Sequence, residues 1–411
     1  MTIRKTLSVV TALLALPLVA CLVGCSDQPH VVPPAVAPAV KGAPAATEDV
    51  PNEFSAELPQ RVEEAVQAEF LRTLEKAKVG DPVAQNDLGV MYEQGAAVVA
   101  DPTEAANWYR KAAEQGVDVA QFNLAVMCAN GTGVVQDDAQ ALLWFRMAAN
   151  QGYADAQCSL GGVYLDGRGV QQDFVEAVKW YRKAAEQGNA VGQFNLGLMY
   201  VNATGVPLDV DQAAAWFQKA AAQELAEAQF RLGYCYLNGE GVEEDEDRAI
   251  LLLRQAAQQE VHEAQYALGV LCRDGHAVPQ DIYEAIKFFQ LAADHGNTAA
   301  LNNLGAIYAS GKDFPVDNAK AVSWYRKAAE LKDATAQYNL GGMYLYGKGV
   351  PRDKVEAYAW IAVAAANGNA SAAVNLKKIE ASLRGGLLSR NRLEEGKQRA
   401  AVYLGQYRNK N

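Results

Sequence analysis

Leucine recurs every 36 residues along most of this chain, and that period constrains the possible folds more than any other feature. The recurring leucines occupy positions 88, 124, 160, 196, 232, 268, 304, 340 and 376. At the same spacing, a column from Trp108 to Trp360 holds six Trp, one Leu and one Phe, and a column from Ala113 to Ala365 holds only alanine. A period kept without insertion indicates an array of like structural units rather than independent domains.

Each 36-residue unit is predicted to contain two amphipathic helices. In the first, typified by 84–95, apolar residues recur every four positions, and in the second, typified by 103–116, they recur three and four positions apart. Both spacings place apolar side chains on one helical face. Because two short helices cannot bury such faces alone, neighbouring units must stack. The predicted fold class is therefore all-α, an α/α solenoid of about eight 36-residue helix-turn-helix repeats.

The ends of the helices carry their own signals. Glycine stands seven residues after the column leucine in every unit but one, where Ala203 replaces it, and glycine there can adopt the left-handed conformation that ends a helix. Asp begins the second helix of all eight units, where its carboxylate can accept hydrogen bonds from the free N–H groups of the first turn. These aspartates lie at 101, 137, 173, 209, 245, 281, 317 and 353.

The nonapeptide WYRKAAEQG occurs at 108–116 and again at 180–188. Trp and Tyr beside Arg and Lys could form a nucleic-acid or anion site, but the net charge of −11 disfavours binding to nucleic acid. The spacing instead places Trp108 and Tyr109 on the apolar face where stacked helix pairs meet. Arg110 and Lys111 are expected at its solvent edge, and no nucleic-acid partner is predicted.

The unit A-x-x-x-LG-x-x-Y-x-x-G-x-G-V-x-x-D-x-x-EA-x-x-WYRKAA-x-x-G, as it stands at 156–188, resembles the Sel-one-like repeat family. That family is a variant of the tetratricopeptide-type solenoids, and the resemblance covers 81–376. It implies a right-handed superhelix whose concave face serves as an adaptor for other proteins.

A capping segment is expected at each end of this array. Residues 61–80 form a lone helix in register with the second half of a repeat, since Ala77 falls in the alanine column. Residues 377–411 contain nine Lys or Arg and three Glu, and a basic cap helix is expected from Leu387 to Tyr407. The basic side of that helix either faces solvent or contacts an anionic lipid, a glycan or an acidic partner.

Residues 1–24 are predicted to be a bacterial lipoprotein signal peptide. Arg4 and Lys5 precede an apolar run that ends at two candidate acylation sites, Cys21 and Cys25. Cys25 is the better candidate because polar residues follow it at once. Ordinary cleavage without a lipid, or an uncleaved anchor, are the alternatives. By resemblance to bacterial lipoproteins, Ser26 favours the outer membrane, whereas Asp27 weakens that assignment.

Residues 25–60 hold seven of the fourteen prolines and are predicted to be an extended tether. Four cysteines lie beyond it, and their even number in an oxidising compartment permits disulfides. Because they lack a regular short spacing, buried free thiols are the preferred interpretation. They are Cys128, Cys158, Cys235 and Cys272.

No catalytic, metal or cofactor site is predicted. The four histidines, at 30, 262, 276 and 295, have no ligand spacing with Cys or with one another. The GxG pairs, as at 131–133, belong to the turn of the repeat and form no phosphate-binding glycine loop.

A protein or peptide partner is expected in a groove lined by the first helices. Residues one turn apart on either side of the column leucine would supply its aromatic and aliphatic lining, with asparagines beside them. The alternative is that these rings pack against the second helix of their own repeat, and that the asparagines bind neighbouring repeats. The predicted groove residues are Phe122, Val126, Phe194, Leu198, Phe230, Tyr234, Tyr266, Asn123 and Asn195.

These features favour a non-enzymatic scaffold of the bacterial cell envelope, tethered to the membrane through a lipid on Cys25. Two other functions stay open: an enzyme or wall-active protein acting on envelope material, and a surface-exposed factor that contacts a host.

Overall fold

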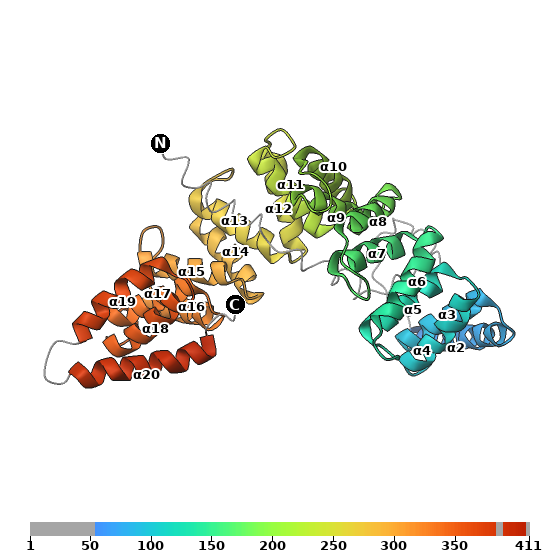
Figure 1. Cartoon of the computed structure of the whole chain (residues 1–411), viewed down its shortest axis with the longest axis horizontal. Helices are drawn as coiled ribbons and strands as arrows, with labels where there is room; N and C mark the ends of the chain where they lie inside the picture. The colour runs from blue at the N-terminus through green and yellow to red at the C-terminus, as the bar shows by residue number, and fades with distance from the viewer. Residues whose placement is uncertain (1–53, 384–388, 408–411) are drawn as a thin grey trace. The chain divides into compact units, whose positions relative to one another are not determined.

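The computed structural model describes the backbone of residues 54–383 and 389–407 and the side chains of 64–383 and 391–407. These residues form the helices α2 to α20, and no strand occurs among them (Figure 1). The all-α solenoid fold is thereby confirmed. The predictions made for the signal peptide, for Cys25 and for most of the tether lie outside the described residues.

Eight helix pairs follow one another along the chain. The first helices of the pairs are α3 (Pro82–Gln94), α5 (Asp118–Asn130), α7 (Ala154–Asp166), α9 (Ala190–Val201), α11 (Ala226–Asn238), α13 (His262–Asp274), α15 (Thr298–Ser310) and α17 (Ala334–Tyr346). The second helices are α4 (Pro102–Glu114), α6 (Asp138–Asn150), α8 (Phe174–Glu186), α10 (Val210–Ala221), α12 (Glu246–Gln258), α14 (Ile282–Asp294), α16 (Asn318–Glu330) and α18 (Lys354–Ala366). We call these pairs repeats 1 to 8.

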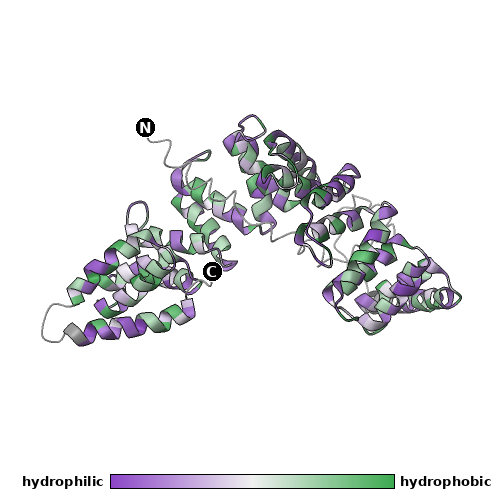
Figure 2. Ribbon diagram, viewed as in Figure 1, coloured by the Kyte–Doolittle hydropathy of each residue, from purple (hydrophilic) through white to green (hydrophobic). Residues whose placement is uncertain are grey.

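The chain divides into two compact units, 1–223 and 224–411. The described part of the first unit contains α2 (Phe54–Lys78) and repeats 1 to 4. The second contains repeats 5 to 8, α19 (Ala370–Leu383) and α20 (Ser389–Tyr407). Within each unit, the two helices of a repeat pack against each other, and the second helix packs against the first helix of the next repeat. Hydrophilic and hydrophobic residues alternate around the helices, as amphipathic segments require (Figure 2).

The predicted caps of the second helices are confirmed. Each of the eight column aspartates accepts a backbone hydrogen bond in the first turn; Asp101 Oδ1, for example, lies 3.0 Å from the Thr103 nitrogen and 3.1 Å from that of Glu104. The turn glycines also adopt the expected conformation, with φ 72° at Gly95. Ala203, which replaces glycine in repeat 4, has φ 52° and tolerates the same left-handed region at a steric cost.

An aromatic ring on a glycine sets the distance between the helices of one repeat. Tyr109 is fully buried on α4 and lies across Gly89 of α3. A Cβ atom added at Gly89 would lie 2.6 Å from the ring carbons of Tyr109, closer than van der Waals contact allows. The same contact recurs in repeat 3, where Gly161 faces Tyr181. The glycine therefore permits a helix approach that alanine would resist.

The column tryptophan joins neighbouring repeats, as predicted. Trp108 of α4 shares a buried cluster with Phe70 and Ala77 of α2, which precedes it. The sequence placed Lys111 only at the solvent edge of this contact, whereas the structure gives it a defined partner. Lys111 Nζ lies 3.5 Å from the centroid of the Trp108 ring, so the exposed lysine covers the indole as a cation–π partner.

A ladder of buried amides accompanies these apolar contacts. The Nε2 atom of Gln157 donates to the Ala149 carbonyl of the preceding repeat at 3.1 Å, and its Oε1 atom accepts from Gln187 Nε2 at 2.7 Å. Each such glutamine thus connects one repeat to the next and fixes the end of its own second helix. The same pair of bonds is made by Gln85, Gln121, Gln193 and Gln337.

Repeats 6 and 7 show what the ladder requires. In repeat 7 both positions are leucine, Leu301 and Leu331, so an apolar pair replaces the amide pair. In repeat 6 only the second position changes, to His295, and the buried Oε1 atom of Gln265 has no hydrogen-bond partner among the described residues. The two positions therefore act together.

Both ends of the array carry further helices. α2 spans Phe54–Lys78 and includes the expected cap helix, but it begins within the segment predicted as tether. At the other end, α20 packs mainly against α18 rather than pairing with α19 (Figure 1). The buried Glu356 of α18 accepts hydrogen bonds from Arg399 at 2.9 Å and from Tyr403 at 2.8 Å, both on α20. This charge-assisted pair fixes the last helix on the array.

We expect Gln157→Leu to lower the free energy of unfolding by about 1–2 kcal/mol, because Gln187 loses its buried acceptor. The double variant Gln157→Leu/Gln187→Leu should lose less than the sum of the two single changes, since it reproduces the apolar pair of repeat 7. Urea unfolding followed by circular dichroism measures all three values. Gln171→Leu, at an exposed glutamine, is the control and should change stability by less than about 0.5 kcal/mol. Strict additivity of the two single variants would contradict the ladder.

Candidate binding surface

The predicted groove residues are mostly core residues. Six of the nine are buried: Phe122, Leu198, Phe230, Tyr234, Tyr266 and Asn195. Several rings contact the second helix of their own repeat, as the alternative interpretation proposed. Phe122 lies 5.9 Å from Phe145, measured between ring centroids, and Tyr266 lies 5.9 Å from Phe289. Their first role is therefore packing, and a partner can reach at most the edges of these six side chains.

The two asparagines of the predicted groove connect neighbouring first helices. Asn123 Nδ2 donates to Asn86 Oδ1 at 3.4 Å, and Asn195 Nδ2 lies 3.9 Å from Cys158 Sγ. In each pair the partner lies 37 residues earlier, on the preceding repeat. The asparagines thus bind neighbouring repeats, the second of the two roles considered from the sequence.

Three of the nine residues retain partial exposure: Val126, Phe194 and Asn123. All three lie on first helices of the first unit, on α5 and α9. Phe194 also contacts Phe217, with 5.7 Å between the ring centroids, so its ring presents one face outward at most. A partner-binding groove along the first helices stays a prediction, and these half-buried side chains are its accessible part.

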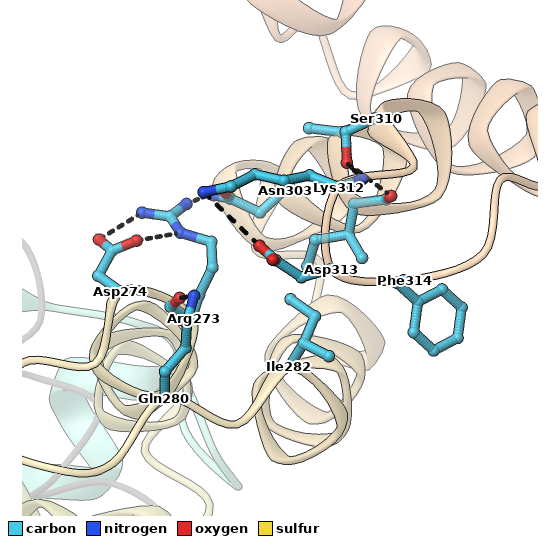
Figure 3. A pocket seen from close by; sticks show the side chains of 11 residues that line it. Arg273, Asp274, Gln280, Ile282, Asn303, Ser310, Lys312, Asp313 and Phe314 are labelled. Carbon is cyan, nitrogen blue, oxygen red and sulfur yellow. Dashed lines mark hydrogen bonds and ion pairs between the residues drawn. The ribbon is translucent and has the colours of Figure 1, made fainter.

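A pocket of about 360 Å³ lies where repeat 7 departs from the pattern of the others (Figure 3). In repeat 2, Gly133 packs so closely on the start of α4 that a Cβ atom there would lie 2.1 Å from the Pro102 carbonyl oxygen. Repeat 7 has Asp313 at this position, and its backbone does not adopt the positive φ found at Ala97 and Ala277 in repeats 1 and 6. The loop instead turns Phe314 against Tyr283 and Tyr308, with 5.4 and 5.3 Å between ring centroids. Alanine also replaces this glycine in repeats 1 and 6, so the missing glycine did not by itself predict the pocket.

The polar groups of this pocket are engaged with one another. Arg273 forms a bidentate pair with Asp274, at 2.7 and 2.8 Å, and also donates to Asn303 (Figure 3). The hydrogen bond to Asp274 raises the pKa of the Arg273 guanidinium. Lys312 Nζ lies 3.8 Å from Asp313. With two cations and two carboxylates paired in this way, the pocket is electrically balanced and brings together no nucleophile with a base.

The described residues also contain no candidate metal-binding cluster. Within 54–383 and 389–407, no group of three or more His, Cys, Asp or Glu side chains could hold a metal ion. His262 and His295 stack with 6.3 Å between ring centroids, and His262 lies 3.2 Å from Glu263. Over the same residues, no helix combines the length and the apolar character needed to cross a membrane.

The four cysteines of the described residues are buried, as preferred from the sequence. Cys128, Cys235 and Cys272 are free thiols, and Cys158 lies beside Asn195. Burial, as the largest cause, raises the pKa of Cys235 to about 12 and that of Cys272 to about 11. A protonated, enclosed thiol is a poor nucleophile, so these residues act as small apolar core residues.

We expect native protein to react very slowly with iodoacetamide at Cys235 and Cys272. Because the pKa is raised, each thiol stays protonated even at a pH well above the ordinary thiol pKa of about 8.5. Burial also hinders access of the reagent to the sulfur. Mass mapping of labelled peptides at pH 8, with and without urea, measures the difference. Labelling should rise strongly on unfolding. Fast labelling of the folded chain, or none after unfolding, would contradict buried free thiols.

The comparisons with known proteins agree with this architecture. A family model for the Sel1 repeat matches eight consecutive segments, 82–117, 118–153, 154–189, 190–225, 226–261, 262–297, 298–333 and 334–369. None of the curated proteins matches the chain.

Two solved structures are similar over most of the chain. A Sel1 repeat protein from Oxalobacter formigenes is 32% identical, with a TM-score of 0.59, and the match covers 90% of this chain and 99% of that one. The protein c5321, a protective antigen of uropathogenic Escherichia coli with an SLR fold, is 30% identical, with a TM-score of 0.53, and the match covers 86% of each chain. Sel1 repeat proteins generally serve as scaffolds for interactions with other proteins. With eight consecutive repeats matched by the family model and a similar structure that is 32% identical, the chain belongs to the Sel1 repeat family.

Proposed function

We propose that this protein is a non-enzymatic scaffold of the bacterial cell envelope that binds a protein or peptide partner along its first helices. One observation carries the proposal: the buried residues that recur from repeat to repeat are used in packing, whereas accessible positions on the first helices differ between repeats. Position 126 is valine, for example, and its equivalent in repeat 7 is the exposed Ala306. A rigid framework with a varied surface suits recognition of another macromolecule.

The membrane attachment rests on the N-terminal sequence. A basic start, an apolar run and Cys25 followed by polar residues support acylation of that cysteine. A lipid at Cys25, followed by a proline-rich segment, would hold the repeats near the membrane and leave them free to meet a partner. Attachment of this kind needs no membrane-spanning helix.

The first test concerns the anchor. Cys25→Ala should move the protein from the membrane fraction to the soluble fraction of the envelope, because the acylated thiol is lost. Immunoblotting of fractionated cells measures the distribution, and Cys21→Ala is the matched control. Membrane retention of Cys25→Ala combined with release of Cys21→Ala would assign the lipid to Cys21. Retention of both variants would contradict a lipid anchor.

A second candidate function is that of a surface-exposed factor that contacts a host. The similar Escherichia coli protein, which is 30% identical to this chain, is a protective antigen. That description favours the second candidate function. The same fractionation experiment separates the two locations when intact cells are treated with a protease. Digestion of the wild-type protein on intact cells would support surface exposure, and digestion only after the outer membrane is opened would support the periplasmic scaffold.

The second test concerns the surface that binds the partner. A photo-crosslinking amino acid at Val126, on the partly exposed line of first helices, should give discrete adducts with a partner in cells. The same amino acid at Val135, which is 89% exposed in the turn between α5 and α6, is the matched control. Immunoblotting of irradiated cells reveals the adducts.

We expect adducts from position 126 to disappear when Phe194→Asp is added, because a charge there disrupts an apolar contact on the same line of first helices. Thermal unfolding checks that the variant stays folded. Identical adducts from both positions would mean that position 126 reports random neighbours and would overturn the groove assignment.

A further inference from the structure

A second pocket, of about 460 Å³, lies between the start of α18 and the cap helix α20. Unlike the pocket of repeat 7, it is rich in unbalanced positive charge. Four cationic side chains line it, Arg352, Lys354, Arg392 and Arg399, against the two carboxylates of Asp353 and Glu395. The lining has a formal charge of +2, and the carboxylate of Glu356, which accepts a hydrogen bond from Arg399, reduces this to +1.

Arg352 occupies a position that is glutamine in repeats 2, 3 and 6. In repeats 3 and 6, Gln172 and Gln280 donate through Nε2 to the carbonyl oxygen seven residues earlier, at 2.7 and 2.8 Å. Arg352 makes the equivalent bond to Leu345 through Nε, at 3.0 Å. This structural role needs only one N–H group. The fold therefore requires neither the terminal nitrogens of the Arg352 guanidinium nor its positive charge.

The neighbouring cations are also available. Within the described side chains, no hydrogen bond or ion pair joins the Lys354 ammonium or the Arg392 guanidinium to an acceptor. Arg399 behaves differently, because it donates to Glu356 at 2.9 Å and to Glu395 at 2.6 Å and so holds α20 in place. One wall of the pocket is fixed by Arg399, while Arg352, Lys354 and Arg392 keep free donors.

Two backbone N–H groups at the start of α18 are not free to bind an anion in the pocket. Asp353 Oδ1 already accepts from the nitrogens of Val355 and Glu356, at 2.8 and 3.0 Å. Any anion in the pocket must therefore be held by the side chains. Arginine forks and a lysine ammonium are the groups that proteins use for phosphate.

We propose that this pocket binds a phosphate group that carries about two negative charges, either on a soluble molecule or on a lipid headgroup. The three cations with free donors, Arg352, Lys354 and Arg392, suit the several charged oxygens of a phosphate better than the two oxygens of a single carboxylate. The cations of the site do not recur in the array. It gives the basic end of the chain a specific ligand class beyond its role as a cap.

The test compares Arg352→Gln with Lys348→Gln. Glutamine at 352 keeps the structural hydrogen bond, as Gln172 and Gln280 do, and removes only the charge. Lys348 is an exposed lysine of the same repeat outside the pocket, so its change to glutamine alters the net charge equally. Both changes are made in the full chain with Cys25→Ala, so that an acyl group does not dominate binding to lipid. Thermal unfolding should be unchanged in both variants.

Two probes distinguish the source of the phosphate. Isothermal titration with inorganic phosphate at pH 8 and constant ionic strength should show saturable binding that Arg352→Gln weakens about tenfold and Lys348→Gln leaves nearly unchanged. Flotation with phosphatidylcholine vesicles, with and without phosphatidic acid, tests a lipid headgroup. Binding that depends on phosphatidic acid and is lost only in Arg352→Gln would support the site with lipid as its ligand.

The proposal fails if neither probe binds saturably. It also fails if both variants weaken binding equally, because that result would reflect the overall charge of the region rather than the pocket.

Discussion

The close approach of two helices around a buried ring is the contact on which this structure depends. Tyr109 fits onto the bare backbone of Gly89, and the same pair of positions recurs as Tyr181 on Gly161 and as Phe289 on Gly269. Such close packing brings the alanines of the second helix against the next repeat, so each unit can bury its faces only when neighbours are present. Repeat 2 shows the tolerance of the arrangement: Ala125 replaces the glycine there, yet Phe145 remains only 4% exposed.

Polar contacts give these apolar interfaces their register. Apolar packing is weakly directional, whereas the buried glutamines accept only one arrangement of neighbours because an unmatched amide is costly. Where the sequence drops the amide in repeat 7, it drops both members of the pair, Leu301 and Leu331. The buried contact between Glu356 and Arg399 plays the corresponding part at the end of the array, where no further repeat follows to cover α18.

Departures from the repeat mark the places where the surface becomes specific. Asp313 lies at a pocket, and its backbone lacks the positive φ that the other repeats adopt at this position. Arg352 adds a charge where glutamine would satisfy the fold. In both cases the framework is unchanged around the exception, since its recurring contacts lie elsewhere. A repeat protein can therefore vary its surface at single positions of one unit without loss of the array.

The sequence by itself determined the period, the two helices of each repeat, their aspartate and glycine ends and the seam formed by the column tryptophans. These features depend on the order of residues within about one turn of helix or on an exact repeat, so they can be read along the chain. The cap helix at the C-terminus was also predicted almost to its observed ends, Ser389–Tyr407.

Only the tertiary structure decided which rings of the first helices are core residues. Helical spacing places Phe122, Phe230 and Tyr266 on one face, but it does not say whether that face meets the second helix or a partner. The amide ladder and the pocket beside α20 likewise join residues from different helices. Their existence depends on distances that only the packed chain defines, because burial and pairing are properties of neighbours in space rather than in sequence.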